Sequence, residues 1–233
     1  MLSSESREPD IARIKPIIAV QPIGSMEQHG LHLPVSTDTI IACEVSRALA
    51  ERIEAFLLPP IPYSCSIEHS RYTSTIWLRP FTLHNLLKDI AISLRVHGFK
   101  ALIIVNGHGG NYNLKSIVRE INYRFGRRPL TLLVDLGSMY FGSRYAEDIH
   151  AGRYETSLML YLKPELVGEL TGDSKPEAMR DYIDYISIDE LTPTGVWGEP
   201  SRASREEGER IFERIVDEAK NYVLDVLKKL GIL

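Results

Sequence analysis

Apolar residues along this chain fall into two alternating patterns. Four short runs have the length and the aliphatic, β-branched composition of buried strands, at residues 17–20, 56–59, 100–105 and 130–136. Five longer stretches repeat apolar residues at helical spacing, at residues 39–54, 82–97, 113–125, 155–162 and 204–230. The alternation predicts an α/β fold, in which helices cover both faces of a mostly parallel central sheet and form a three-layer α/β/α sandwich.

Local residues indicate where two of these elements begin and end. Pro59 and Pro60 should end the second strand abruptly, because proline has no N–H to donate to a neighbouring strand. Thr82 is the expected N-cap of the helix at residues 82–97, and Gly98 is its expected end.

Residues 164–200 do not follow the alternation. The segment is acidic, is interrupted by proline and glycine, and is too long for an ordinary connection in a compact domain. It also carries much apolar surface, at Leu166, Val167, Leu170, Tyr182, Ile183, Tyr185, Ile186, Ile188, Leu191, Val196 and Trp197. We predict one domain over residues 1–233, in which this segment buries its apolar side chains either as a lid or against another subunit.

Composition and charge exclude several classes of function. The 233 residues include 25% charged residues and carry a net charge of −4, so no excess of positive charge favours nucleic acid or an anionic membrane. No apolar run is long enough to span a membrane. Cys43 and Cys65 lack the spacing of a disulfide framework or a metal motif. A cytoplasmic protein is the prediction.

The most informative polar residues follow the first strand. Glu27, His29, His32 and Asp38 are all types that bind divalent metals. Glu27 and His29 are two residues apart, so their side chains leave the same face of an extended segment. Such a pair suits a borderline cation such as zinc, manganese or iron. A solvated polar loop is the alternative, and Asp38 could instead cap the helix that begins beside it.

Two later segments place similar residues beyond other strands. Residues 106–111 read Asn-Gly-His-Gly-Gly-Asn and follow the strand at 100–105, while residues 149–157 contain His150 and Glu155 at the start of a helix. In open α/β sheets, ligands bind at the carboxyl edge of the strands. Three such loops together favour a metal site over three unrelated polar loops.

These three segments together resemble the creatininase family of metal-dependent amidohydrolases. The resemblance rests on Gly24-Ser25-x-Glu27-Gln28-His29-Gly30-x-His32-Leu33-Pro34 with Thr37-Asp38, on Asn106-Gly107-His108-Gly109-Gly110-Asn111, and on His150-Ala151-Gly152-x-x-Glu155-Thr156-Ser157. It covers residues 15 to 230, with weaker matches at Glu68-His69 and at residues 195–201. The family includes creatinine amidohydrolase, an archaeal formamidopyrimidine-nucleotide deformylase and a peptidase that trims the mycofactocin precursor.

The resemblance implies one or two divalent metal ions per chain. Glu27, Asp38 and His108 would hold one cation, and Asp38 would bridge to a second cation held by His29 and Glu155. One position departs from the family pattern, because creatininase itself has a metal-binding glutamate where this chain has Gly110. We expect Glu155 to replace that ligand, and the departure favours a substrate other than creatinine.

The remaining polar residues suit roles beside the metals. An imidazole ionises near neutral pH, so His150 is the expected proton donor to the departing amine, with a loop histidine at a helix terminus as the alternative. His32, which could instead orient a metal ligand or pack beside Pro34, and His69 are candidate substrate contacts. So are the amides and backbone N–H groups of the glycine-rich loop, at Asn106, Gly109, Gly110 and Asn111.

The sequence therefore predicts a metal-dependent hydrolase of a non-peptide, amide-type carbon–nitrogen bond in a small molecule. A formamidopyrimidine-nucleotide deformylase is the alternative substrate assignment. A binding protein that retains the metal without the chemistry is an alternative of a different class. The family resemblance further implies a homo-oligomer, with a hexamer as the expected size.

Overall fold

A four-stranded parallel sheet lies at the centre of the computed structural model, which describes residues 1–140, 148–170 and 172–233. The strand order is β2-β1-β3-β4. The strands are β1 (Ile18–Ile23), β2 (Phe56–Leu57), β3 (Ala101–Asn106) and β4 (Leu130–Asp135). Every neighbouring pair is parallel, so the predicted parallel sheet is confirmed.

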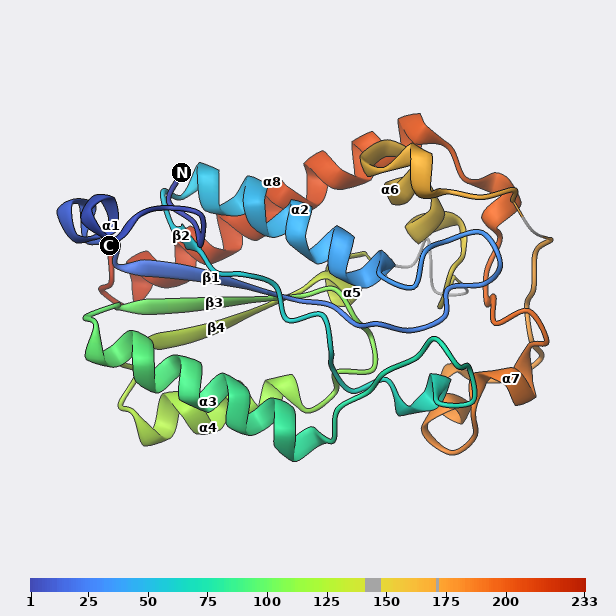
Figure 1. Cartoon of the computed structure of the whole chain (residues 1–233), viewed down its shortest axis with the longest axis horizontal. Helices are drawn as coiled ribbons and strands as arrows, with labels where there is room; N and C mark the ends of the chain where they lie inside the picture. The colour runs from blue at the N-terminus through green and yellow to red at the C-terminus, as the bar shows by residue number, and fades with distance from the viewer. Residues whose placement is uncertain (141–147, 171) are drawn as a thin grey trace.

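Helices cover both faces of this sheet, as the α/β/α prediction requires (Figure 1). One face carries α2 (Thr37–Arg52), α6 (Arg153–Leu162) and α8 (Arg205–Lys229), and the other carries α3 (Pro80–Val96) and α4 (Leu114–Arg124). Shorter helices are α1 (Glu8–Ile14), α5 (Leu136–Tyr140) and α7 (Ile188–Leu191). Short 3₁₀ helices occupy Ile67–His69, Pro164–Leu166, Arg180–Asp184 and Pro200–Arg202.

Strand β3 shows why both layers are needed. All six of its residues are buried, and the five apolar ones alternate between two separate cores. Ala101, Ile103 and Val105 pack with α2, α6 and α8, whereas Leu102 and Ile104 pack with α3 and α4. A strand that is apolar on both faces can be stable only between two helical layers.

Most element boundaries agree with the sequence pattern, and one helix start was wrong. Helix α3 begins at Pro80 with Arg79 as its N-cap, so Thr82 lies inside the first turn and does not cap it. Proline favours this first helical position because its fixed backbone angle suits a helix and its missing N–H would be unpaired there. Ser204, in contrast, caps α8 by accepting the Glu207 N–H at 3.2 Å.

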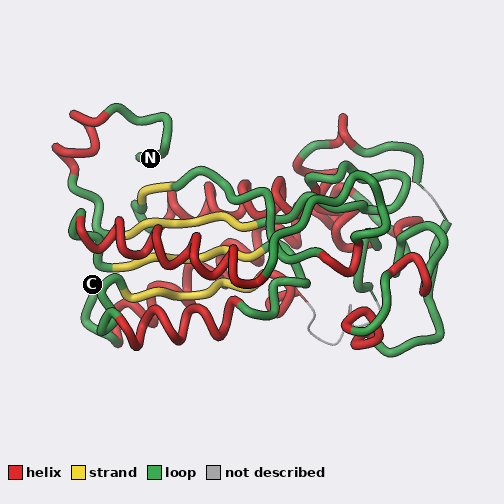
Figure 2. Tube along the Cα trace, turned by 60° about the horizontal axis from the view of Figure 1, so that its bottom comes forward, coloured by secondary structure: helices red, strands yellow, loops and turns green. Residues whose placement is uncertain are grey.

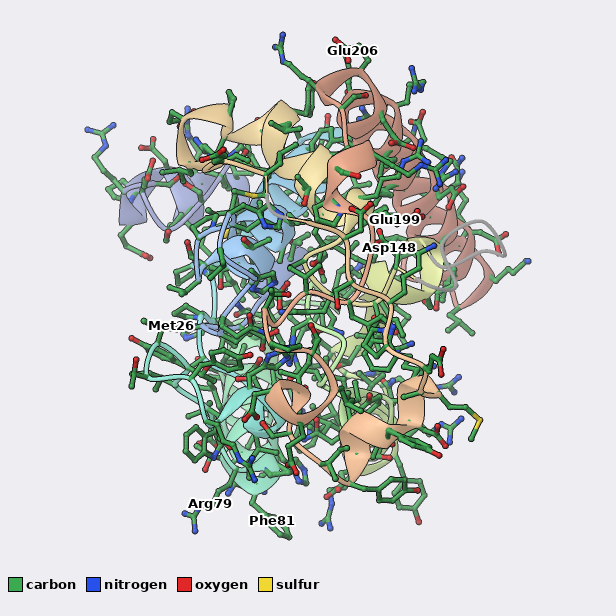
Figure 3. The ribbon with its side chains drawn as sticks, turned by 90° about the vertical axis from the view of Figure 1, so that its right-hand side faces the viewer. Met26, Arg79, Phe81, Asp148, Glu199 and Glu206 are labelled. Atoms are coloured by element: carbon green, nitrogen blue, oxygen red, sulfur yellow. The ribbon has the colours of Figure 1, made fainter. Side chains whose placement is uncertain are left out.

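The strand order changes direction between β1 and β3. From β1 the chain passes to β2 on one side, and the next strand, β3, lies on the other side of β1. The loops beyond β1 and β3 diverge at such a point and leave a crevice at the carboxyl edge of the sheet. Loops gather at this end of the molecule (Figure 2), and Figure 3 looks onto it.

The segment at residues 164–200 divides into two parts. Ile188, Val196 and Trp197 are buried within the chain, and Trp197 pairs with His150 as an isolated bridge. Met179 and Tyr185 instead expose 65% and 79% of their surface. The part from Ile188 onward therefore covers the loops at the carboxyl edge of the sheet. The part before it, which includes Met179 and Tyr185, leaves apolar side chains exposed within one chain. Among the described residues, no helix is long and apolar enough to cross a membrane.

Several apolar residues between 164 and 186 are exposed, and the predicted homo-oligomer would bury them. We expect light scattering at micromolar concentration to report an assembly several times the chain mass of 26.4 kDa, because association would remove this surface from water. A single species near 26.4 kDa would contradict it.

Candidate metal centre

The loop after β1 places Glu27 at the centre of a buried polar cluster. Glu27 is fully buried, and neither of its carboxylate oxygens has a hydrogen-bond partner among the described residues. His108 Nδ1 lies 3.3 Å from Oε2, and His69 Nε2 lies 3.4 Å from Oε1. Burial raises the pKa of Glu27, because it removes water from the charged carboxylate, and the charge of Asp38 raises it further. A carboxylate in this setting needs a positive partner.

Asp38 stands in the first turn of α2 but does not cap it. Ser25 Oγ donates to Asp38 Oδ2 at 2.8 Å, and the N-cap of α2 is Ser36. The two oxygens face different histidines, with Oδ2 2.9 Å from His108 Nδ1 and Oδ1 3.1 Å from His29 Nε2. This arrangement has the form of a carboxylate that bridges two cations.

Backbone carbonyls orient both of these histidines. His108 Nε2 donates to Cys65 O at 2.9 Å, and His29 Nδ1 donates to the carbonyl of Glu27 at 3.2 Å. In each ring the other nitrogen therefore faces the carboxylates. Metal-binding histidines commonly have their second nitrogen held in this way.

Glu155 completes the His29 side of the cluster. It lies at the start of α6, where its Oε2 accepts the Ala151 N–H at 2.6 Å and lies 3.8 Å from His29 Nε2. Asp148 holds this turn in place by accepting the N–H groups of Arg153 and Tyr154 at 2.9 and 2.7 Å. Asp148 lies beside Glu199 near the same end (Figure 3).

The carboxylates dominate the electrostatics of the cluster. Burial alone would lower the pKa of His29, but the charges of Asp38 and Glu155 outweigh it and raise this pKa to about 10. The pKa of His108 is likewise raised, against the effect of burial, chiefly by Glu27 and Asp38. The site thus favours added positive charge, which a proton or a cation can supply.

These residues fit a divalent metal. Ligand atoms of Glu27, His29 and Asp38 lie within 4.8 Å of one another, as do those of His29, His150 and Glu155. Carboxylate oxygens and imidazole nitrogens are the donors that zinc, manganese and iron accept. The two unpartnered oxygens of Glu27 are the strongest indication, because a buried carboxylate rarely lacks donors unless an ion satisfies it.

Two further histidines line the cluster. His150 Nδ1 lies 3.7 Å from Glu27 Oε1, and the His150 ring lies between those of His29 and His69, with centroid separations of 4.3 and 4.4 Å. Burial lowers the pKa of both His150 and His69, so both rings are neutral near pH 7. The structure therefore brings together all five predicted ligands with His150 and His69.

Three other predicted substrate contacts, Asn106, Asn111 and His32, instead form hydrogen bonds within the protein. The side chain of Asn106 donates to the carbonyl of His108 at 2.9 Å, and Asn111 donates to Asn106 Oδ1 at 2.9 Å. His32 is buried, and its Nε2 lies 2.8 Å from Thr156 Oγ1. Gly109 is exposed, so its backbone N–H remains a candidate substrate contact.

Gly110, which the sequence suggested as a substrate contact, is closely packed. A Cβ at this position would meet Glu68 Oε1, His108 Nε2 and, at 2.7 Å, the backbone carbonyl of Cys65. Glu68 Oε1 also lies 3.5 Å from His108 Nε2. A glutamate at residue 110, as creatininase has, would collide with Glu68. The position of Glu68 therefore requires a glycine at residue 110.

Sequence reasoning assigned no role to Ser25, Gln28 or Glu68, which all contact the cluster. Ser25 binds Asp38, Gln28 contacts His69, and Glu68 approaches His108. Ser25 and Gln28 stand inside the first motif, and Glu68 precedes His69, so their positions were visible. Their partners were not, because each contact joins residues that are 13 or more positions apart.

Comparison with known proteins gives a consistent picture. A family model described as creatininase, creatinine amidohydrolase, matches residues 4–223. A mycofactocin precursor peptide peptidase of Mycobacterium ulcerans is 38% identical over 84% of this chain and 80% of its own length. Creatinine amidohydrolase of Pseudomonas putida is 30% identical over 84% of each chain. A solved structure titled "Creatininase Mn" superposes with a TM-score of 0.82 at 25% identity, covering 96% of this chain and 98% of that chain.

Replacement of Asp38 by alanine separates bridging from capping. If each oxygen of Asp38 faces a different cation, Asp38→Ala should lose both, whereas His29→Ala should chiefly weaken one. Loss of a cap would cost only about 1 kcal/mol of stability and would leave metal content unchanged. Metal analysis after dialysis measures the difference, and normal metal content in Asp38→Ala would refute the bridge.

Gly110→Ala tests the packing behind His108. The new Cβ should displace Glu68 and the His108 ring, since the Cys65 carbonyl cannot move without the backbone. We expect weaker metal binding, measured by titration, in a protein that remains folded by circular dichroism. Gly109→Ala is the matched control, because its nearest neighbour would be the flexible end of Arg180 at 3.3 Å. Equal metal affinity in both variants would contradict this account.

Proposed function

Because the chain belongs to the creatininase family of hydrolases that act on carbon–nitrogen bonds, we propose that it hydrolyses an amide-type bond in a metal-dependent reaction. The observation that carries the proposal is the buried carboxylate of Glu27, which has no hydrogen-bond donor within bonding geometry among the described residues and faces His108 at 3.3 Å. A structural role alone would not require so many ionisable groups to converge in a buried site.

The residues divide between holding the cation and moving protons. Glu27, Asp38 and His108 would hold one ion, and His29 and Glu155, with Asp38 between, would hold a second. When bound, a divalent cation lowers the pKa of water toward neutrality and polarises the amide carbonyl. Zinc, manganese and iron all suit this donor set.

We assign the proton transfer to His150. Its Nε2 donates to the carbonyl of Gln28 at 2.7 Å, so its Nδ1 carries the lone pair and faces Glu27. Nδ1 takes a proton from the attacking water as the carbon–oxygen bond forms. It then returns that proton to the leaving nitrogen as the carbon–nitrogen bond breaks, which yields a carboxylic acid and an amine.

Similarity to a peptidase widens the range of substrates that we propose beyond non-peptide amides. The prediction of a non-peptide amide agrees with the similarity to creatinine amidohydrolase, but the identity to a peptidase is higher, at 38% against 30%. Gly110 also lacks the carboxylate that creatininase has. We therefore include a peptide amide among the candidate substrates, beside the formamide of the deformylase alternative. A binding protein without catalysis is disfavoured, because His150 adds a proton-transfer group that metal retention does not need.

Metal removal tests the proposal directly. Release of amine from a panel of short peptides, formamides and lactams should stop after treatment with a chelator and return on addition of zinc, manganese or iron. We expect one to two equivalents of metal to be taken up per chain. Activity that persists in metal-free protein would sink the proposal.

His150→Ala measures the proton-transfer role. Turnover should fall by roughly 10²–10⁴, the range expected for a general acid or base, while metal content stays unchanged. Loss of metal together with activity would identify His150 as a ligand instead. Unchanged turnover would leave it a loop histidine at a helix terminus.

A further inference from the structure

Gln28 lies buried between two of the loops that build the site, and two contacts determine how its amide is oriented. Gln28 Oε1 accepts the Gly30 N–H at 2.8 Å, and Nε2 donates to the carbonyl of Gly195 at 3.2 Å. An N–H can pair only with the amide oxygen, and a carbonyl can pair only with the amide nitrogen. Exchanging the two ends of the amide would therefore lose both bonds. Gly195 also packs directly against this amide, since a Cβ at Gly195 would meet it.

The oriented amide determines which nitrogen of His69 carries the proton. Gln28 Nε2 lies 2.9 Å from His69 Nδ1. Because Nε2 of Gln28 can only donate, Nδ1 of His69 must accept, and the proton of the neutral ring is on Nε2. That N–H points into the cluster, where Nε2 lies 3.4 Å from Glu27 Oε1.

The backbone of the same residue sets the opposite state in His150. Its Nε2 donates to the Gln28 carbonyl at 2.7 Å, so the lone pair is on Nδ1, 3.7 Å from the same Glu27 oxygen. The two rings are 4.4 Å apart. One histidine thus presents a donor and its neighbour presents an acceptor to a single point beside Glu27.

We propose that Gln28 is a positioning residue that holds His69 and His150 in opposite tautomers, and that His69 Nε2–H is a hydrogen-bond donor to the substrate carbonyl oxygen. The inference rests on the proposed amide hydrolysis and adds a role for His69. As water attacks, its proton passes to His150 Nδ1 and the carbonyl oxygen gains negative charge. His69 Nε2–H donates to that oxygen without losing its proton. When the carbon–nitrogen bond breaks, the electron pair on the oxygen re-forms the C=O double bond, and the leaving nitrogen keeps the bonding pair and takes the proton from His150.

The same geometry argues against a metal ion held by Glu27, His69 and His150, whose ligand atoms also lie within 4.8 Å. Such an ion would need a bare Nε2 on His69, and then Nδ1 would carry a hydrogen that faces the Gln28 amide hydrogens. Two donors cannot pair with each other. The proposal requires a proton on His69 Nε2, whereas a metal ion at this place requires the same nitrogen to be unprotonated.

Nitrogen NMR of the histidine rings distinguishes them without any assay of turnover. In ¹⁵N-histidine-labelled protein, both metal-free and loaded with diamagnetic zinc, we expect His69 to show a protonated Nε2 and a bare Nδ1. His150 should also show a protonated Nε2. His69→Gln and His150→Gln identify the signals. A bare Nε2 on His69 in either form would overturn the proposal, even if the protein proves to be an amidohydrolase.

Two variants of Gln28 test whether its amide is the cause. In Gln28→Glu an acceptor faces Nδ1, so the proton of His69 should move from Nε2 to Nδ1; in Gln28→Met the Nδ1 contact is lost, and its resonance should shift. We expect turnover to fall about 10- to 100-fold in each, with KM and metal content little changed. His69 signals unchanged in both variants would refute the role of Gln28.

Gln21→Glu is the matched control. Gln21 is also buried, and its amide donates to the backbone carbonyls of Pro22 and Pro59 at 3.0 and 2.8 Å, away from any histidine of the site. This variant loses comparable donor bonds but should leave the His69 signals and turnover unchanged. Equal effects in Gln21→Glu and Gln28→Glu would assign them to general loss of stability and overturn the proposal.

Discussion

Concentrated negative charge in a buried place is the constraint on which this molecule depends. Glu27, Asp38 and Glu155 converge at the carboxyl edge of the sheet, and Glu27 has no hydrogen-bond donor among the described residues. Removing such charges from water is costly unless a positive partner is present. The raised pKa of His29 and His108 is one response to this charge, and the divalent cation of the proposed function would be another.

The parallel sheet explains how side chains so far apart in sequence reach one place. Strands β1 and β3 are neighbours and end together, with Ile23 opposite Asn106. Their loops therefore emerge side by side at the point where the strand order changes direction, and α6 brings Glu155 from one covering layer. Buried cores on both sides of the sheet pack against the strands that carry these loops.

The sequence predicted the strands, the long helices and the candidate metal ligands, but not the contacts between the loops of the site. Apolar periodicity identified all four strands and the five long helices, because burial on one or two faces leaves a direct trace. The start of α3 was misplaced, since Pro80 and Thr82 both offer start signals and periodicity does not rank them. The packing of Gly110 under Glu68 and the partners of Gln28 could not be predicted, because they depend on how distant loops meet.

The site contains two kinds of group, candidate metal ligands and groups that determine where a histidine carries its proton, and only the first kind can be recognised from sequence. A metal ligand is recognisable by type, since only a few side chains offer a suitable oxygen or nitrogen. A group that determines the proton on a histidine has no such signature: the carbonyls of Cys65, Glu27 and Gln28 and the Gln28 amide all do so here. Three of these four groups are backbone atoms, which no substitution alters. The protonation pattern of this site is therefore largely a property of loop conformation, and Gln28 is the place where a side chain contributes to it.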